Sequence, residues 1–502
     1  MPKPSGNIEM VATVVDREMH LGRIDSTEPV DSVLPLVVDL DNTVAKTDLT
    51  LEALLKLLRQ EPLYFFFLPL WLLRGWNHCA GRVASHSSLD VEVLPYRTEF
   101  LDYLKTQRAR GRRIVLTTTG SARMAQRVAD YLGLFDVVLA TEGSQKPSNH
   151  SQREKLVLTF GEKGFDYATS GRTGAAILSS AQRVVLVNPG INGRRIASSR
   201  TEIDRVFEDQ RRHVGDYLQP LRPQHWLKNI LVFVPVFAAH RFYETVLLEK
   251  SLIAFAALSC CASGGYLFND LLDLAADRRH PRKRLRSFAG GKLPLSYAFV
   301  MIPGLVGLGC VLGLLISPLF PGMLLAYLIL TLIYSLYIKR VVLLDVIVLA
   351  GLYTLRIMAG SAAVSIWPSH WLLAFSSFLF LSLALVKRYS ELVIMRKIDG
   401  DHAKARGYEI GDAELLAAKG TASGYIAVFV LALYITSGPA GSLYGRHEVI
   451  WFICPLLLYW IGRMWLVAHR GQMNDDPVVF AATDWTSRTL LLLMIGIAVL
   501  AL

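Results

Sequence analysis

The sequence has little of what marks soluble or secreted proteins. Only 19% of its 502 residues are charged and 52% are hydrophobic, a balance too apolar for an ordinary soluble enzyme. The five cysteines show no metal-ligand spacing and most lie in apolar runs, so we expect buried thiols without a disulfide framework. Residues 1–32 contain no apolar core of the signal-peptide type, and we expect the first part of the chain to stay in the cytosol. These absences leave a membrane protein as the default interpretation.

The composition changes near residue 217. Before it, short apolar runs alternate with charged, helix-like stretches, as in an α/β domain; after it come long apolar segments, most of them able to cross about 30 Å of hydrocarbon as helices. The nine predicted spans are 226–243, 250–272, 294–315, 318–338, 342–363, 367–388, 419–437, 448–468 and 486–502. The predicted fold is multi-domain, with a tail (1–32), an α/β domain (33–205), a linker (206–220) and an all-α polytopic membrane domain (221–502).

The formal charge of +11 is concentrated in loops on one side of the predicted spans. Basic residues cluster in 278–292, 339–340, 387–406 and 463–470, whereas the opposite loops "SPLFPG" and "SIWPSH" carry almost no charge. By the positive-inside rule, we expect the basic loops and the N-terminal domain to face the cytoplasm, in a multi-pass protein of a bacterial cytoplasmic membrane. The clusters lack interleaved stacking aromatics, which argues against nucleic-acid binding.

Residues 268–284 read "FNDLLDLAADRRHPRKR", acids followed by bases directly after an apolar run. In a helix, Asn269, Asp273 and Asp277 are four residues apart and share one face, while Asp270 points elsewhere. Oxygen ligands at a helix end suit Mg²⁺, which completes its shell with water and substrate phosphates. The alternative is a solvated helix end whose acids pair with the arginines that follow.

The stretch "NDLLDLAADRRHPRKR" resembles the first aspartate-rich motif, N-D-x-x-D-x-x-x-D, of the UbiA superfamily of intramembrane prenyltransferases. Over roughly 217–502 the chain is most similar to the branch of decaprenyl-phosphate phosphoribosyltransferases. That similarity lies in "LRPQHWLKN" at 221–229, "DRRHPRKRLR" at 277–286, "YSLYIKRVVLLDVIVLAGLYTLRIMAG" at 334–360 and "LALVKRYSEL" at 383–392. The resemblance implies transfer of phosphoribose from phosphoribosyl diphosphate to a polyprenyl (decaprenyl) phosphate. It also implies Mg²⁺ at Asn269, Asp273 and Asp277, with Asp270 beside them.

Ordinary aromatic prenyltransferases of this superfamily carry a second aspartate-rich motif on a later helix. The corresponding stretch here, "KRYSELVIMRKIDGDHAKARGY" at 387–408, is rich in bases and has its acids in other spacing. Fixed cations suit two anionic substrates better than a neutral aromatic acceptor. The candidate phosphate-binding residues are Lys228, Arg278, Arg282, Lys283, Arg284, Arg286, Lys387, Arg388, Glu391 and Arg406.

Several of these interpretations have alternatives. Lys228 is equally suited to anchor the first span at headgroup level, and Tyr353 and Arg356, inside a span, suit either function or helix pairing. Asp475 and Asp476 are expected on the cytoplasmic rim. Two other functions stay open: transfer of a prenyl group to an aromatic or quinone precursor, and a non-catalytic membrane scaffold. The sequence does not indicate an oligomeric state.

In the N-terminal region, "LPLVVDLDNTVAKTDL" at 34–49 resembles the first motif of haloacid dehalogenase-like phosphatases, with Asp39 as the nucleophile and Asp41 as the acid/base. "RRIVLTTTGS" at 112–121 resembles the second motif, with Thr118 as the phosphate-binding hydroxyl, and Lys146 or Lys155 corresponds to the motif lysine. An insert, "EPLYFFFLPLWLLRGW" at 61–76, is too short to span a bilayer and is expected to rest on the membrane.

The fourth motif of those phosphatases supplies carboxylates for Mg²⁺. The matching segment here, "FDYATSGRTGAAIL" at 165–178, has Ser170 and Gly174 in the two acid positions. An aspartyl nucleophile without this metal-ligand charge should work poorly, so we expect a weak or inactive phosphatase domain. The alternative is a bifunctional enzyme that makes the phosphoribosyl lipid and then removes its 5-phosphate.

Overall fold

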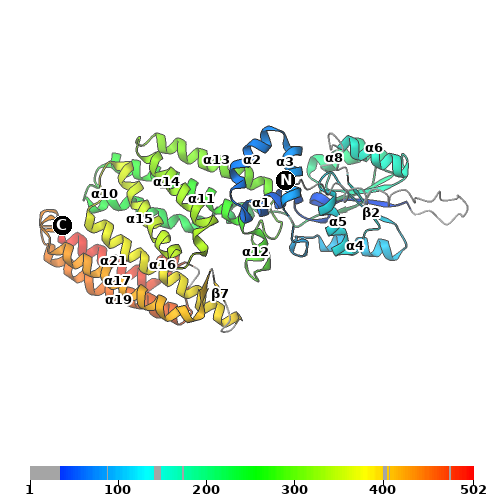
Figure 1. Ribbon diagram of the computed structural model, residues 1–502. Coiled ribbons are helices and arrows are strands. Elements are labelled where there is room, and N and C mark those ends of the chain that lie inside the picture. Colours follow the sequence, from blue (N-terminus) through cyan, green and yellow to red (C-terminus); the bar gives the residue numbers. More distant parts are fainter. Residues whose placement is uncertain are drawn as a thin grey trace, which may run out of the picture.

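The computed structural model describes residues 34–87, 89–140, 149–171, 175–399, 404–405, 407–473 and 476–502. An α/β domain and a longer helical domain lie end to end (Figure 1). Between them lie three helices, α1 (Leu49–Gln60), α2 (Tyr64–Leu73) and α3 (Trp76–His86).

The α/β domain is built on a parallel sheet of six strands in the order β3-β2-β1-β4-β5-β6. The strands are β1 (Leu36–Asp39), β2 (Ile114–Thr118), β3 (Val137–Ala140), β4 (Asp166–Thr169), β5 (Arg183–Val187) and β6 (Glu202–Phe207). Because successive side chains of a strand point to opposite faces, Val38 and Val37 enter different cores. Helices cover both faces, as the continuous apolar runs of these strands require. The predicted α/β domain is confirmed.

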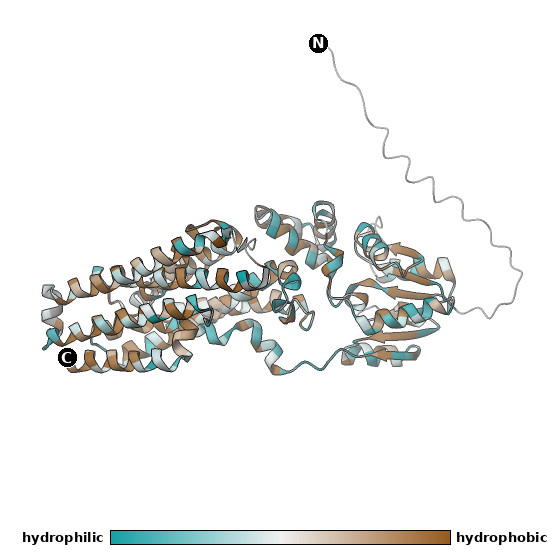
Figure 2. Ribbon diagram, turned by 90° about the horizontal axis from the view of Figure 1, so that it is seen from below, coloured by the Kyte–Doolittle hydropathy of each residue, from teal (hydrophilic) through white to brown (hydrophobic). Residues whose placement is uncertain are grey.

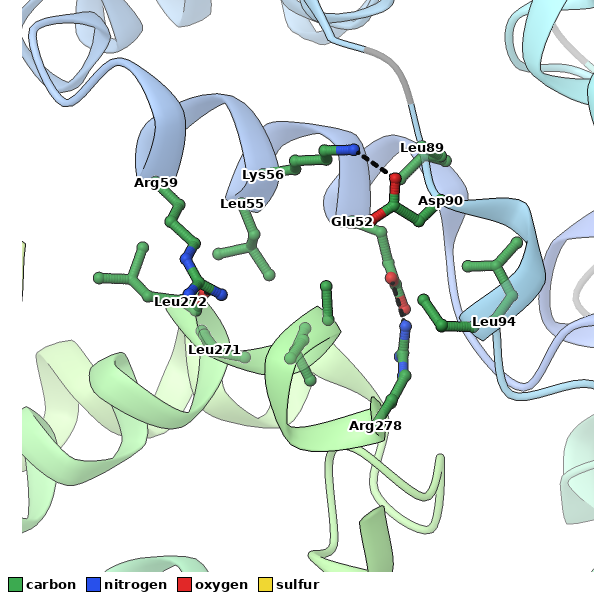
Figure 3. A pocket seen from close by; sticks show the side chains of 13 residues that line it. Glu52, Leu55, Lys56, Arg59, Leu89, Asp90, Leu94, Leu271, Leu272 and Arg278 are labelled. Atoms are coloured by element: carbon green, nitrogen blue, oxygen red, sulfur yellow. Dashed lines mark hydrogen bonds and ion pairs between the residues drawn. The ribbon is translucent and has the colours of Figure 1, made fainter. Parts of the chain in front are cut away.

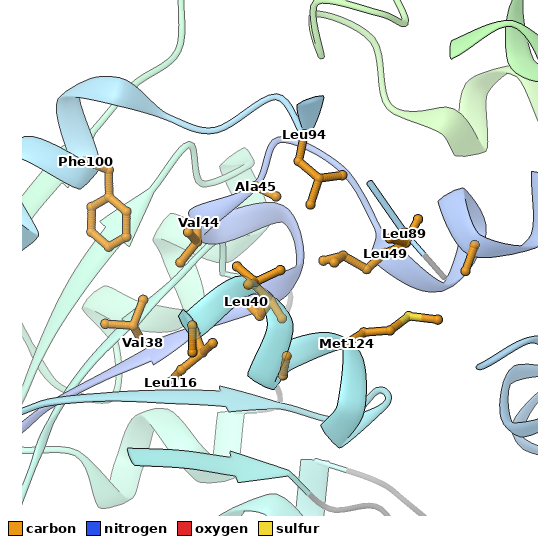
Figure 4. Packing of buried hydrophobic residues seen from close by; sticks show 14 of the residues in the cluster. Val38, Leu40, Val44, Ala45, Leu49, Leu89, Leu94, Phe100, Leu116 and Met124 are labelled. Carbon is orange, nitrogen blue, oxygen red and sulfur yellow. The ribbon is translucent and has the colours of Figure 1, made fainter. Parts of the chain in front are cut away.

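Two layers of helices complete these cores. The helices beside Val38 are α4 (Thr98–Ala109) and α5 (Ala122–Leu132). Figure 4 shows Phe100 of α4 near Val44 and Val38, and Met124 of α5 directed toward Leu49 and Leu89. The helices beside Val37 are α6 (Asn149–Phe160), α7 (Ala175–Ser180) and α8 (Ile191–Ser198).

A tight loop follows β1 and shapes the carboxyl edge of the sheet. It is formed by η2 (Leu40–Val44), in which Asn42 has a φ of 59°, a left-handed conformation that asparagine tolerates. Helix α1 then begins after Asp48, whose carboxylate accepts the Leu51 N–H at 3.1 Å.

The predicted membrane-resting insert forms the helix α2. It is ten residues long and has no buried side chain; Phe66 and Leu73 are 75% and 84% exposed. A helix of this length is too short to cross a bilayer. Its contact with a membrane surface stays a prediction.

The helical domain contains seven helices long and apolar enough to cross a membrane, counted over the described residues. They are built on α11 (Thr245–Leu272), α13 (Leu295–Leu314), α14 (Phe320–Leu336), α15 (Leu344–Val364), α16 (His370–Asp399), α17 (Ala413–Ile435) and α19 (Ile453–His469). The pair α20 (Pro477–Thr483) and α21 (Trp485–Ala501), bent by 80°, makes an eighth if it is one span. The prediction of nine was therefore too high. An all-α membrane domain is confirmed, and apolar residues run along its full length (Figure 2).

The first predicted span, 226–243, was wrong as an α-helix. This stretch forms a 3₁₀-helix, η5 (Pro223–Phe233), followed by the short α10 (Val234–Ala238). Pro223 and Pro235 cannot donate the backbone hydrogen bonds that a regular α-helix needs. The 3₁₀-helix rises about 2.0 Å per residue, more than an α-helix, so this short segment is long for its number of residues. At the start of this segment, Arg222 forms an ion pair with Asp270. Just after its end, the ring centroid of His240 lies 4.6 Å from that of Tyr444.

Candidate active site

Acidic and basic side chains gather at the end of the helical domain that faces the α/β domain. Asn269 and Asp270 lie in the last turn of α11, and Asp277 lies in α12 (Leu274–Arg279). Asp273 joins the two helices with φ −94° and ψ 6°. The predicted acid-rich helix is thus interrupted at Asp273.

Asn269 and Asp273 converge on one cation. Lys339, just after α14, donates from Nζ to Asn269 Oδ1 at 3.2 Å and to both carboxylate oxygens of Asp273 at 3.0 Å. Three oxygens around one positive charge are the kind of donor set that Mg²⁺ prefers. These two residues therefore fit a divalent cation that takes the place of the ammonium group.

Asp277 and Asp270 form a second pair. Arg286 donates from Nη1 to Asp277 Oδ2 at 2.6 Å and to Asp270 Oδ1 at 3.3 Å, and Arg222 also binds Asp270. The predicted stripe of three ligands is therefore divided in this structure, with Asp277 directed to Arg286. Among the described residues, no three histidine, cysteine, aspartate or glutamate side chains are grouped as a metal site.

A second cluster is formed by two lysines around a buried carboxylate. Lys228 donates to Asp476, and Lys387 Nζ lies 3.7 Å from the same carboxylate. Asp476 also caps α20, accepting the Val478 N–H at 3.1 Å. Burial opposes ionisation of Asp476, but Lys228 and Lys387 hold its pKa well below the usual range. Asp475 lies outside the described residues.

The segment η5 connects the two clusters. In a 3₁₀-helix, side chains three residues apart eclipse, so His225 and Lys228 form one row on η5. Arg222 comes just before this helix and has a left-handed backbone with φ 52°. The ring of His225 lies 5.4 Å from that of Tyr266, and the Nδ1 of His225 has no hydrogen-bond partner within the described structure. Burial, together with Lys228, lowers the pKa of His225 to about 3, so its imidazole is neutral. Sequence reasoning missed Arg222 and His225, although the spacing of three in "RPQHWLK" was a signal.

Arg388 lies in the protein interior. It is fully buried, its Nη2 lies 2.5 Å from Asp345 Oδ2, and it also pairs with Glu391. Tyr408 donates to Asp345 Oδ1 at 2.6 Å, which ties the segment before α17 to α15. In this arrangement the Arg388 guanidinium joins α15 and α16.

Arg356 is similarly occupied between helices. Its Nε donates to Asn229 Oδ1 at 3.0 Å and its Nη2 to Tyr327 Oη at 3.1 Å. Of the two roles open to this residue, the contacts are those of helix pairing. Tyr353 lies between two cations, since Arg356 Cζ lies 5.4 Å and Lys228 Nζ 5.7 Å from its ring centroid.

The remaining predicted basic residues differ in their exposure. Arg278 pairs with Glu52 of the α/β domain. Arg282 and Arg284 are exposed, and Lys283 is half-buried. Arg406 lies outside the described residues.

In the α/β domain, Asp39, Asp41 and Thr118 lie at the carboxyl ends of β1 and β2. Thr118 Oγ1 donates to Asp41 Oδ2 at 3.1 Å, and the Leu49 N–H donates to Asp41 Oδ1 at 2.9 Å. Burial, and then repulsion from Asp48, raises the pKa of Asp41 to about 7, although these hydrogen bonds oppose the shift.

The predicted acid and lysine positions of this domain are only partly described. Ser170 follows β4, is buried, and has an Oγ without a hydrogen-bond partner in the described structure. Lys155 Nζ donates to the Ala140 carbonyl at 2.8 Å. Gly174 and Lys146 lie outside the described residues.

A bundle of membrane-length helices that gathers carboxylates and cations at one end is the architecture of an integral membrane protein. The UbiA prenyltransferase family model matches residues 230–499, more than half of the chain. The chain therefore belongs to the UbiA prenyltransferase family and is a multi-pass membrane transferase.

Its relatives include proteins with and without an assigned reaction. The chain is 33% identical over 462 residues to the uncharacterized protein y4nM of Sinorhizobium fredii (91% of this chain, 89% of the relative). It is 37% identical over 287 residues to the nodulation protein NoeC of Azorhizobium caulinodans (56% and 91%). It is 33% identical over 185 residues to the decaprenyl-phosphate phosphoribosyltransferase of Mycobacterium tuberculosis (36% and 61%).

Among solved structures, a UbiA homologue from Archaeoglobus fulgidus bound to GPP and Mg²⁺ aligns with a TM-score of 0.43 at 16% identity. The alignment covers 56% of this chain and 99% of that one.

Proposed function

We propose that the helical domain transfers 5-phosphoribose from phosphoribosyl diphosphate to a polyprenyl phosphate and releases diphosphate. The observation that carries this proposal is the presence of two cation clusters at one end of the bundle. The first cluster lies around the acid-rich segment, residues 269–277, and consists of Arg222, Arg286 and Lys339. The second lies around Asp476 and consists of Lys228 and Lys387. A donor and an acceptor that both carry phosphate each need fixed cations. The named phosphoribosyltransferase relative supports the same reaction.

The acid-rich segment is proposed to hold Mg²⁺ at Asn269 and Asp273, with Asp277 and Asp270 beside them. When bound there, Mg²⁺ would neutralise charge on the departing diphosphate. Lys339, which holds these oxygens in the described structure, would then turn to donate to a diphosphate oxygen, as would Arg286.

Lys228 and Lys387 are proposed to hold the phosphate of the lipid acceptor. Asp476 pairs with both ammonium groups and aligns them, and the neutral ring of His225 adds no further charge to this cluster. A phosphate nucleophile is already ionised near neutral pH, so the protein needs no strong base and acts through positioning and charge neutralisation. Arg388 is proposed to join helices in this scheme and not to bind phosphate.

The basic end is proposed to face the cytoplasm of a bacterial cell. The acid-rich segment and the arginines that pair with it adjoin α1 of the α/β domain. The positive-inside rule predicts a cytoplasmic face for such a basic end. The polyprenyl chain would then lie along the apolar helices and present its phosphate to the row on η5.

The experiment is to incubate membranes that contain the full chain with labelled phosphoribosyl diphosphate, polyprenyl phosphate and Mg²⁺. Label should enter the lipid phase. Asp273→Ala and Lys228→Ala should abolish the transfer, whereas Glu244→Ala, which changes a carboxylate just before the opposite end of α11, should not. No labelled lipid from the wild type, or unchanged transfer by Asp273→Ala, would remove the proposal.

A second candidate is transfer of a prenyl group to an aromatic or quinone precursor, which the family match favours. The nodulation relative bears a name that specifies no reaction. The same membranes, supplied with a prenyl diphosphate and an aromatic acid, separate the two. A prenylated aromatic product without labelled phosphoribosyl lipid would favour this candidate.

For the α/β domain we infer at most weak phosphomonoesterase activity. In its favour, Asp41 has a pKa near neutrality, and a pocket of about 340 Å³ lies at the carboxyl edge of the sheet, lined by Asn42, Ser170 and, from the helical domain, Gly291. Against it, a buried hydroxyl stands at Ser170 where a metal-binding carboxylate was expected. Purified protein should release little inorganic phosphate from the lipid product; rapid release that Asp39→Asn abolishes would show a bifunctional enzyme.

A further inference from the structure

Helix α1 of the α/β domain packs against the junction of α11 and α12 (Figure 3). Leu55 of α1 is buried with Leu271 and Leu274 in a cluster of the helical domain, and Leu272 is buried in a core of the α/β domain. Each domain therefore contributes a side chain to the other's core. The cavity left between them is only about 40 Å³.

A buried ion pair fixes the orientation of this contact. Arg278 of α12 donates from Nη1 and Nη2 to the two carboxylate oxygens of Glu52 at 2.7 and 2.5 Å, and both side chains are 6% exposed. Arg278 Nε also donates to the Ala289 carbonyl at 3.0 Å. A two-point pair of this kind sets direction as well as distance.

Arg59, in the last turn of α1, reaches the acid-rich segment itself. Its Nη1 donates to the Leu272 carbonyl at 3.1 Å, one of the carbonyls at the C-terminal end of α11 that lack a partner within the helix. Its Nη2 lies 3.6 Å from Asp273 Oδ1, the carboxylate that Lys339 holds from the helical domain. Asp273 thus lies between one cation from each domain.

We propose that α1 is a positioning element of the transferase site. Arg59 fixes the end of α11 and the carboxylate of Asp273, and Glu52 fixes α12 through Arg278. The acid-rich segment then keeps its geometry toward metal and diphosphate only while the α/β domain is docked. This proposal rests on the proposed phosphoribosyl transfer, and it gives the α/β domain a role that does not require phosphatase activity.

The first test measures amide hydrogen exchange of residues 273–279 in the purified full chain without substrate. Exchange should be faster in Arg59→Ala and Glu52→Gln than in the wild type, because the contacts that hold this segment are lost. Arg194→Ala is the matched control, since Arg194 pairs with Glu208 on the exposed surface of α8. Exchange that is the same in all four proteins would overturn the proposal.

The second test separates positioning from general stability. Arg59→Ala should raise the KM for phosphoribosyl diphosphate and the Mg²⁺ concentration for half-maximal transfer by about tenfold, the effect of one charge-assisted hydrogen bond. Arg59→Lys should recover part of this loss and Arg194→Ala should show none. Unchanged KM and Mg²⁺ dependence in Arg59→Ala would refute positioning by Arg59. If the wild type transfers no label, the proposed function fails, while the exchange test still decides whether α1 holds the acid-rich segment.

Discussion

The buried pair of Asp345 and Arg388 makes a prediction that separates structure from substrate binding. Both side chains are fully buried, and their closest oxygen and nitrogen lie 2.5 Å apart. Removing one member of such a pair costs about 3–5 kcal/mol, because the other charge is left without compensation. In Asp345→Ala, Tyr408 also loses the oxygen to which it donates.

The expected loss in Asp345→Ala is therefore at least about 3 kcal/mol, which corresponds to a Tm lower by about 5 °C for a domain of this size. Asp345→Asn should lose less, since it keeps an acceptor for Tyr408. The double variant Asp345→Leu with Arg388→Met should lie closest to the wild type, because the two fully buried charges are removed together. Glu391, which loses its pairing with Arg388, is partly exposed. The assay heats the detergent-solubilised protein and measures what remains monodisperse, with Glu249→Ala on the exposed surface of α11 as the control.

Two results would refute this reasoning. The first is an Asp345→Ala variant that melts with the wild type; the second is a double variant no more stable than Asp345→Ala. The transfer assay adds a functional criterion. A stable double variant that still makes labelled lipid would show that Arg388 serves helix packing. A stable but inactive double variant would support the prediction that Arg388 binds phosphate.

Two further predictions concern the other parts of the fold. The pKa of Asp41 rises from 3.8 to about 7 on folding, so its contribution to stability is present below pH 4 and lost as the pH rises through 7. Asp41→Asn should remove that loss of stability, which is on the order of 2 kcal/mol after allowing for partial exposure. Thermal unfolding measured over a pH series tests this, and the same pH dependence in the wild type and in Asp41→Asn would contradict it. In α15, a Cβ on Gly360 would lie 2.1 Å from the Val232 carbonyl, while one on Gly351 would meet nothing within 4 Å. Gly360→Ala should therefore lower stability by about 1–3 kcal/mol and Gly351→Ala should not, and equal melting of the two would show that η5 moves away freely.

Much of the fold could be predicted from local pattern alone. The apolar runs after residue 217 are long enough to predict helices without any knowledge of their neighbours. The strand-like runs before it predicted an α/β domain, which the structure builds on a parallel sheet. The first span failed because length and hydropathy do not distinguish a 3₁₀-helix from an α-helix. Pro223 and Pro235, together with the buried polar pair Lys228 and Asn229, were the signs of an irregular segment.

The candidate site could be predicted only in part. The spacing of four residues within one helix correctly predicted that Asn269 and Asp273 lie close together. The helix is interrupted at Asp273, and Asp277 instead binds Arg286. A helical repeat in the sequence does not indicate where such an interruption occurs. The partners of these residues come from distant parts of the chain. Lys339 lies 70 residues from Asn269, and Glu52 lies 226 residues from Arg278. Such pairs depend on tertiary packing, which a single sequence does not give.

The pairing of every carboxylate in the acid-rich segment has a consequence for how ligands bind. Arg286 bridges Asp270 and Asp277, and Lys339 holds Asp273. Unpaired charge at a membrane boundary is costly, so these groups should exchange partners together and not one at a time. Lys339 can turn to a diphosphate oxygen only when another cation takes over Asp273 and Asn269. Each ligand should therefore lower the Kd of the other by the same factor, about tenfold, beyond their association in solution. Calorimetric titration of Mg²⁺ and inorganic diphosphate, singly and together, measures that factor. Lys339→Met should abolish it, and an equal factor in both proteins would show that Lys339 takes no part in the exchange.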